Sequence, residues 1–148
     1  MTQQSRRKMF TTAAVAATGL AAAAAPMAAR AAAAGKLKAV FQVSDADAGK
    51  WNLTLNNVRN VKNELLDDGA ELEIVAFGPG IGLLKAGSPL AERITEARKD
   101  GITIVACENS MKAQKLVYAD MLSNIGFVPA GVVELIKKQR DGWAYIRP

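Results

Sequence analysis

The feature that most constrains how this chain folds is the alternation of strand-like and helix-like segments between residues 35 and 148. Short apolar runs alternate with stretches in which apolar side chains recur every three or four residues. The runs predict strands at 37–43, 71–77, 101–107 and 143–147, with a short strand or turn at 128–132. The stretches between them predict helices at 51–65, 88–100, about 110–123 and 133–140. Such alternation indicates βαβ units in one α/β domain, and therefore a mainly parallel sheet of about five strands with helices on both faces.

Residues 1–34 have a different character and predict an export signal. A basic start is followed by an alanine-dominated stretch and several Ala-x-Ala sites, which is the pattern of a signal peptide. The Arg6–Arg7 pair resembles a twin-arginine signal. We expect cleavage after Ala31 or Ala34 and a periplasmic location. The alternative is an alanine-rich helix that stays attached as an anchor. Such a helix is too weakly apolar to span a bilayer comfortably, and we therefore expect no stable membrane insertion.

The charge balance argues against a nucleic-acid partner once this segment is set aside. The whole chain has 19 basic and 14 acidic residues. Four of the basic residues and none of the acidic ones lie in residues 1–34, which leaves 15 against 14 in the rest. A nearly neutral domain has no basic footprint for nucleic acid.

The chain contains no histidine and only one cysteine. The absence of histidine excludes Ser-His-Asp and Cys-His catalysis and any histidine-bearing metal site. The presence of only one cysteine excludes an intramolecular disulfide, a CxxC redox pair and a cysteine-based zinc site within one chain. We therefore expect neither a metal nor a cofactor. In an exported protein a lone thiol is buried, bonded to another chain, or reactive.

That single cysteine, Cys107, stands between the apolar run 101–107 and a polar turn, Glu108 to Met111, with the chemistry of a helix start. Unpaired amide groups at a helix start favour an anion, and such surroundings lower the pKa of a thiol. Lys112 is a further candidate to stabilise the thiolate, and no general base other than the adjacent Glu108 is near in sequence. The opposing interpretation is a buried thiol that packs as a small apolar side chain.

Three loops follow the first three predicted strands, at 44–50, 78–82 and 107–111. Ligand sites of parallel sheets gather beyond the carboxyl ends of the strands, so any chemistry is expected where these loops meet. Gly78, Gly80 and Gly82 suggest a phosphate loop, but the dinucleotide fingerprint needs a glycine at position 83 and no Walker lysine–serine pair follows. A tight turn that forms one wall of a pocket around the thiol is the better interpretation.

Two other polar groups are candidates for ligand contacts. Trp51 with Asn52, Asn56 and Asn57 resembles a polar ligand face, although a tryptophan on a helical stripe is more often core and the asparagines solvated. The pair Asp45 and Asp47 resembles a carboxylate dyad or a metal loop, yet the glycine and distal glutamate of an EF-hand are missing, which favours a solvated loop.

Several segments resemble the DsrE/DsrF-like family, in the family's order and spacing. These are 73–80 (EIVAFGPG), 104–111 (IVACENSM) and the two closing stretches 128–135 and 142–148. The resemblance spans essentially all of residues 35–148. It implies a flavodoxin-like three-layer α/β sandwich that assembles into homotrimers or hexamers, and sulfur carried as a persulfide on a cysteine.

The candidate site residues follow from this resemblance and from the loops. Cys107 is the candidate sulfur-bearing residue, and Asn109 and Met111 match the motif of the family's single-chain branch. The candidate binding residues are Gly78, Gly80, Asn109, Ser110 and Met111.

The first functional hypothesis is an exported sulfur carrier, more a carrier than an enzyme with its own turnover. Its partners would be sulfur donor and acceptor proteins or small sulfur species. The alternative is an oligomeric binding or scaffold module with a buried, non-reactive cysteine, because related members without the cysteine serve as assembly partners. A third hypothesis is a thiol sensor that is oxidised to sulfenic acid.

Overall fold

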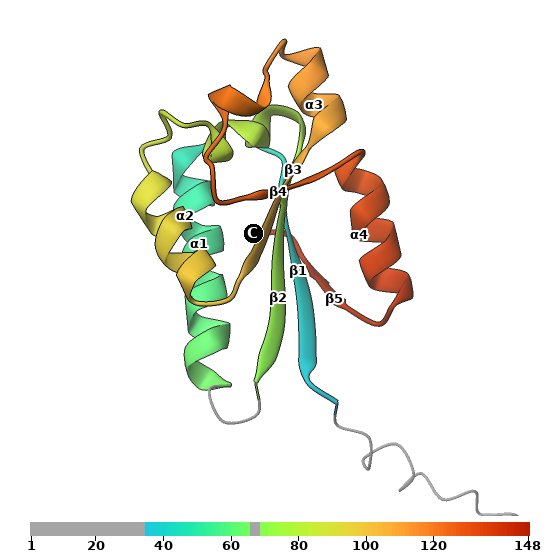
Figure 1. Ribbon diagram of the computed structural model, residues 1–148. Coiled ribbons are helices and arrows are strands. Elements are labelled where there is room, and N and C mark those ends of the chain that lie inside the picture. The colour runs from blue at the N-terminus through green and yellow to red at the C-terminus, as the bar shows by residue number, and fades with distance from the viewer. Residues whose placement is uncertain (1–34, 66–68) are drawn as a thin grey trace, which may run out of the picture. The chain divides into compact units, whose positions relative to one another are not determined.

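The computed structural model describes residues 35–65 and 69–148 (Figure 1), and the predicted export signal at 1–34 lies outside the described residues. Five strands form one sheet in the order β4-β3-β2-β1-β5, and every neighbouring pair is parallel. The strands are β1 (Leu37–Val43), β2 (Ala70–Ala76), β3 (Thr103–Cys107), β4 (Gly126–Val128) and β5 (Ala144–Ile146). The prediction of a mainly parallel, five-stranded sheet is confirmed.

Helices cover both faces of the sheet, which gives the three layers expected of a flavodoxin-like fold. Figure 1 shows α1 and α2 on one face and α4 on the other. The helices are α1 (Ala48–Glu64), α2 (Ala91–Lys99), α3 (Glu108–Ala113) and α4 (Gly131–Arg140), with two 3₁₀ helices, η2 (Gly78–Leu84) and η3 (Tyr118–Asp120). None of the helices in the described ranges is long and apolar enough to cross a membrane.

The core follows from the alternation of side chains along each strand. Phe41, Ile74 and Ile104 lie side by side in register and are fully buried in the larger cluster, which α1 and α2 cover. The opposite face has a smaller cluster in which Val75 and Val105 pack with Leu135 of α4. One helix therefore closes the face of the sheet that bears the smaller core.

The order of the strands places a topological switch point between β3 and β4. The chain steps outward from β1 to β4 along the sheet and then returns to the far side of β1 through α4. The connections that leave β3 and β4 therefore run in opposite directions, and crevices at such points bind ligands in open α/β sheets. Cys107 and Val128 are paired residues at the ends of these two strands.

The helix predicted at 110–123 is wrong in length, because α3 ends at Ala113. Lys115 has a φ of 56°, in the left-handed region that stops a helix. The N–H of Leu116 donates to the carbonyl of Met111 at 2.9 Å, and the N–H of Lys115 donates to that of Lys112 at 3.1 Å. These two bonds form a Schellman motif, in which glycine usually takes the left-handed position. A lysine there leaves no signal of the helix end in the sequence.

Other boundaries also differ from the prediction. Helix α2 begins at Ala91 rather than at 88, although the Ser88 hydroxyl accepts a hydrogen bond from the N–H of Leu90 at 3.3 Å. Strand β4 ends at Val128, where the predicted strand begins, and α4 starts at Gly131 rather than at 133.

Replacing Lys115 by glycine should stabilise the protein by about 0.5–1 kcal/mol, because a left-handed conformation strains every residue that has a Cβ atom. Urea denaturation would measure the change. The matched control is Lys112→Gly, where the same change within α3 should destabilise by about 1 kcal/mol. Equal stability of wild type and Lys115→Gly would contradict the assigned strain.

Candidate functional site

Cys107 is the last residue of β3 and the N-cap of α3, so its side chain lies where a central strand passes directly into a helix. It is a free cysteine, and only 4% of it is exposed. The residue two positions earlier, Val105, faces α4. Cys107 lies on the same face because side chains alternate along a strand.

Four polar groups near the sulfur of Cys107 influence its ionisation. Burial alone would raise the pKa of the thiol, because the charged form loses water. Polar groups near the sulfur, namely the hydroxyl of Ser110 and the backbone N–H groups of Gly131, Ser110 and Asn109, favour its charged form and together outweigh that effect. The pKa of Cys107 is therefore lower than that of an ordinary cysteine, which favours the thiolate.

Ser110 joins the thiol to the loop that follows β2. Its Oγ accepts a hydrogen bond from the N–H of Gly78 at 2.7 Å. The hydroxyl proton is then free to point at the sulfur of Cys107. The predicted meeting of the loops at 78–82 and 107–111 is therefore what the structure shows.

The glycines of the loop after β2 serve close packing of the backbone. Gly78 has a φ of 53°, which favours glycine. A Cβ on Gly80 would lie 2.6 Å from the carbonyl carbon of Val43 and 2.8 Å from the N atom of Ser44. The N–H groups of Gly78 and Gly80 are already bonded, to Ser110 and to the carbonyl of Phe77. The segment is a tight turn, η2, and not an open cradle for phosphate.

Gly131 belongs to the site and was not among the predicted site residues. It is the first residue of α4, and its N–H helps to lower the pKa of the Cys107 thiol from the far side of the switch point. A Cβ there would lie 2.9 Å from the Cβ of Phe77, so only glycine allows this approach. Asn109 links the two helix starts, because its N–H donates to the carbonyl of Pro129 at 3.2 Å. No signal in the sequence pointed to this role, because Gly131 lay within the strand or turn predicted at 128–132.

The model of the DsrE/DsrF-like family matches residues 8–148. The chain belongs to the DsrE/DsrF-like family. That family is associated with sulfur relay. No curated protein matches the chain in sequence.

Solved structures agree with this family assignment. A protein of unknown function from Methanobacterium thermoautotrophicum is 30% identical, with a TM-score of 0.73, over 76% of this chain and 100% of that one. A protein of unknown function from Bacteroides thetaiotaomicron is 17% identical, with a TM-score of 0.63, over 75% of this chain and 94% of that one. The ychN protein of E. coli is 8% identical, with a TM-score of 0.57, over 76% and 98%. The last two similarities show the fold alone.

The two residues that match the DsrE/DsrF-like motif beside Cys107 lie in different surroundings. The side chain of Asn109 is exposed, and its backbone N–H, which donates to the carbonyl of Pro129, lies near the thiol. Met111 is 4% exposed and lies in the core cluster under α1 and α2, whereas the thiol faces α4. The structure therefore does not bring the Met111 side chain to the sulfur.

The charged neighbours of Cys107 do not lower its pKa. Lys112 is exposed and is not among the groups that stabilise the thiolate. The carboxylate of Glu108 accepts a hydrogen bond from the hydroxyl of Tyr118, which raises the pKa of that tyrosine. Uncharged hydrogen-bond donors therefore define the electrostatics of this DsrE/DsrF-like site.

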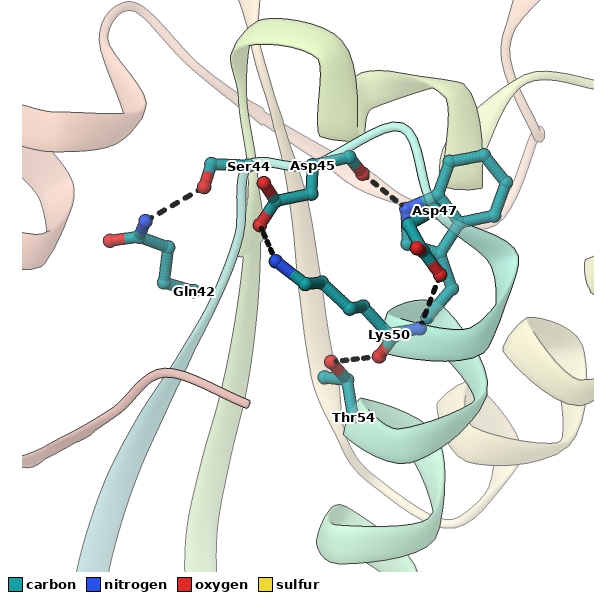
Figure 2. Close-up of polar contacts among 7 residues, drawn as sticks. Gln42, Ser44, Asp45, Asp47, Lys50 and Thr54 are labelled. Carbon is teal, nitrogen blue, oxygen red and sulfur yellow. Dashed lines mark hydrogen bonds and ion pairs between the residues drawn. The ribbon is translucent and has the colours of Figure 1, made fainter.

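The loop after β1 builds the start of α1 and not a carboxylate dyad (Figure 2). Asp47 is the N-cap of α1 and accepts a hydrogen bond from the N–H of Lys50 at 3.0 Å. The carboxylate of Asp45 pairs with the Lys50 ammonium group at 3.1 Å. Across the described residues, no three acidic, cysteine or histidine side chains come together as a metal site.

The tryptophan and asparagines of α1 have structural partners. Trp51 is buried, as predicted, and its Nε1 donates to the carbonyl of Asp45 at 2.7 Å. The interpretation of Asn52 and Asn56 as merely solvated is wrong. Their Oδ1 atoms accept hydrogen bonds from the guanidinium group of Arg93 at 2.6 and 2.7 Å, which ties α1 to α2.

Proposed function

We propose that this DsrE/DsrF-like protein carries sulfane sulfur as a persulfide on Cys107. The observation that carries the proposal is the position of the thiol at the end of β3, beside Ser110 and the first turns of both α3 and α4, where its charged form is favoured. Both the thiolate and the persulfide are anions, and amide groups at helix starts favour anions. The association of the family with sulfur relay supports the same chemistry.

Loading begins with attack of the Cys107 thiolate on a sulfane sulfur atom. With thiosulfate as donor, a new S–S bond forms to Cys107, the bond between sulfane sulfur and sulfite sulfur breaks, and sulfite leaves with the electron pair. With a polysulfide, the shortened polysulfide leaves instead. For unloading, the thiolate of an acceptor attacks the outer sulfur of the persulfide, and the Cys107 thiolate is the leaving group. No external oxidant or reductant is needed in either step.

We also propose that the protein is exported and works as a homo-oligomer. The Arg6–Arg7 pair and the alanine-rich stretch after it support export. Three apolar side chains of α4, Val132, Val133 and Ile136, are 55%, 44% and 61% exposed, which supports an assembly that covers this face. Cell fractionation tests the first part and light scattering of the purified protein tests the second. A cytoplasmic protein would contradict export, and a monomer would contradict assembly.

The proposed function predicts both the ionisation of Cys107 and its chemistry. Because its pKa is lowered, alkylation of the native protein by iodoacetamide should reach half of its maximal rate at a pH below that of an ordinary cysteine. Incubation with thiosulfate or polysulfide should then add the mass of one sulfur atom, which dithiothreitol removes. Cys107→Ser should abolish the gain completely.

The matched control is Ser110→Ala, which keeps the thiol and removes the hydroxyl donor. Its alkylation profile should move to higher pH. If the native protein is labelled only after denaturation, Cys107 is the buried, non-reactive residue of the scaffold alternative. A wild type that gains no sulfur from either donor would overturn the carrier role.

A further inference from the structure

We propose that Gln114 is a positioning residue for Cys107 that acts through Gly78 and the hydroxyl of Ser110. The inference rests on the proposed role of Cys107. It adds a residue whose side chain contacts neither the thiol nor the Ser110 hydroxyl, but the carbonyl of Gly78. It assigns a purpose to a polar contact between the end of α3 and the loop after β2.

Two hydrogen bonds hold the main-chain N–H and carbonyl of Gly78, and we call this pair of bonds the clamp. Its N–H donates to the Oγ of Ser110 at 2.7 Å, and its carbonyl accepts a hydrogen bond from the Nε2 of Gln114 at 2.9 Å. Ser110 and Gln114 are one helical turn apart, and the N–H of Gln114 donates to the carbonyl of Ser110 at 3.1 Å. Helix α3 therefore holds Gly78 by both its donor and its acceptor.

The clamp matters because a serine hydroxyl has a single proton and rotates freely. While the Oγ of Ser110 accepts from Gly78, its proton is directed away from that donor and can point toward the sulfur of Cys107. Without this bond, a serine in a helix tends to donate to a carbonyl of the preceding turn instead. The orientation of Gly78 thus decides whether the strongest donor to the thiolate stays in place.

Gly78 needs the clamp more than another residue would. It has a φ of 53° and no side chain, so its own conformation is weakly restrained. A Cβ at this position would have only one neighbour within 4 Å, the carbonyl oxygen of Ser44 at 3.9 Å, so no close contact restrains Gly78 on that side. The hydrogen bond from Gln114 supplies the restraint that packing does not.

Gln114 is suited to a test because its side chain is exposed and belongs to no core cluster. Gln114→Ala removes the side chain, and Gln114→Met keeps its length without a donor. Both variants are expected to fold as the wild type does. The matched control is Gln139→Ala in α4, because the Nε2 of Gln139 also donates to a main-chain carbonyl, that of Leu135, at 3.2 Å.

The experiment is a pH titration of protein labelled with ¹³C at the cysteine Cβ, whose chemical shift reports thiol ionisation without any reagent. One cysteine gives one signal. Both Gln114 variants should ionise at higher pH than the wild type and Gln139→Ala. Alkylation at a pH below the midpoint should slow by roughly three- to tenfold, the range of one weakened hydrogen bond to a charged group.

A double variant separates positioning from a general structural effect. In a Ser110→Ala background, Gln114→Ala should cause no further change in the ionisation of Cys107. The inference would be overturned if Cys107 ionised in both Gln114 variants as it does in the wild type. It would also be overturned if Gln114→Ala shifted the ionisation equally in the wild-type and Ser110→Ala backgrounds. A wild type that ionises at low pH but takes up no sulfur would refute the proposed carrier role and leave the clamp intact.

Discussion

Replacing Gly80 by alanine is expected to lower the free energy of unfolding by about 3 kcal/mol or more, because a methyl group would be forced into the backbone of β1. The added Cβ would lie 2.6 Å from the carbonyl carbon of Val43 and 2.8 Å from the N atom of Ser44, and closer still to the Val43 oxygen. None of these atoms is the flexible end of a side chain. The strain can be relieved only by moving η2 away from the end of β1.

Urea denaturation followed by circular dichroism measures this loss. The matched control is Gly87→Ala, seven residues later, where an added Cβ has no neighbour within 4 Å and φ is not positive. That change should alter stability by no more than about 0.5 kcal/mol. A Gly80→Ala variant as stable as Gly87→Ala would show that the turn after β2 is not packed against β1 as the structure describes.

The strands of the sheet were predictable because the hydrophobic pattern of each strand is visible in the sequence. The run 37–43 matches β1 residue for residue, since branched and aromatic side chains there alternate between two buried faces. The strand order was not predictable, because hydrophobic patterns do not say which strand neighbours which. That order is what makes the ends of β3 and β4 a switch point and gives Cys107 its place.

The site was only partly predictable, for a related reason. The loops after β2 and β3 were expected to meet because parallel strands end at one edge of the sheet. Gly131 could not be assigned to the thiol, because its approach depends on how α4 packs against Phe77 across the sheet. Met111 was wrongly predicted to line the site, because closeness in sequence does not fix the direction of a side chain. It lies near Cys107 in sequence, but its side chain faces the other core.

Helix α4 is held to the sheet by a buried ion pair as well as by apolar contacts. Glu73 of β2 is 2% exposed and pairs with the ammonium group of Lys138, which also lies 4.2 Å from the centre of the Trp143 ring. Burial raises the pKa of Glu73 despite this partner, so the pair fixes a position more than it adds stability. The second half of α4 is thus anchored to β2, and its first turn lies near the thiol.

Replacing Gly131 by alanine should therefore raise the pKa of Cys107 and lower stability by about 1–3 kcal/mol, the usual range for overpacking. The new Cβ would lie 2.9 Å from the Cβ of Phe77 and 3.1 Å from its Cδ1. The first turn of α4 must shift to make room, and the N–H of Gly131 then moves away from the sulfur. One of the donors that offset the burial of the thiol is weakened, so the thiolate becomes less favourable.

The pH profile of Cys107 alkylation and urea denaturation measure the two effects separately. Val132→Ala is the matched control, because it changes the next residue of α4, which is 55% exposed, and leaves the N–H of Gly131 in place. It should leave the ionisation of the thiol as in the wild type. Lower stability with unchanged ionisation in Gly131→Ala would mean that α4 only covers the thiol. A shift of the profile to higher pH in Gly131→Ala alone would show that both helix starts at the switch point act on one sulfur atom.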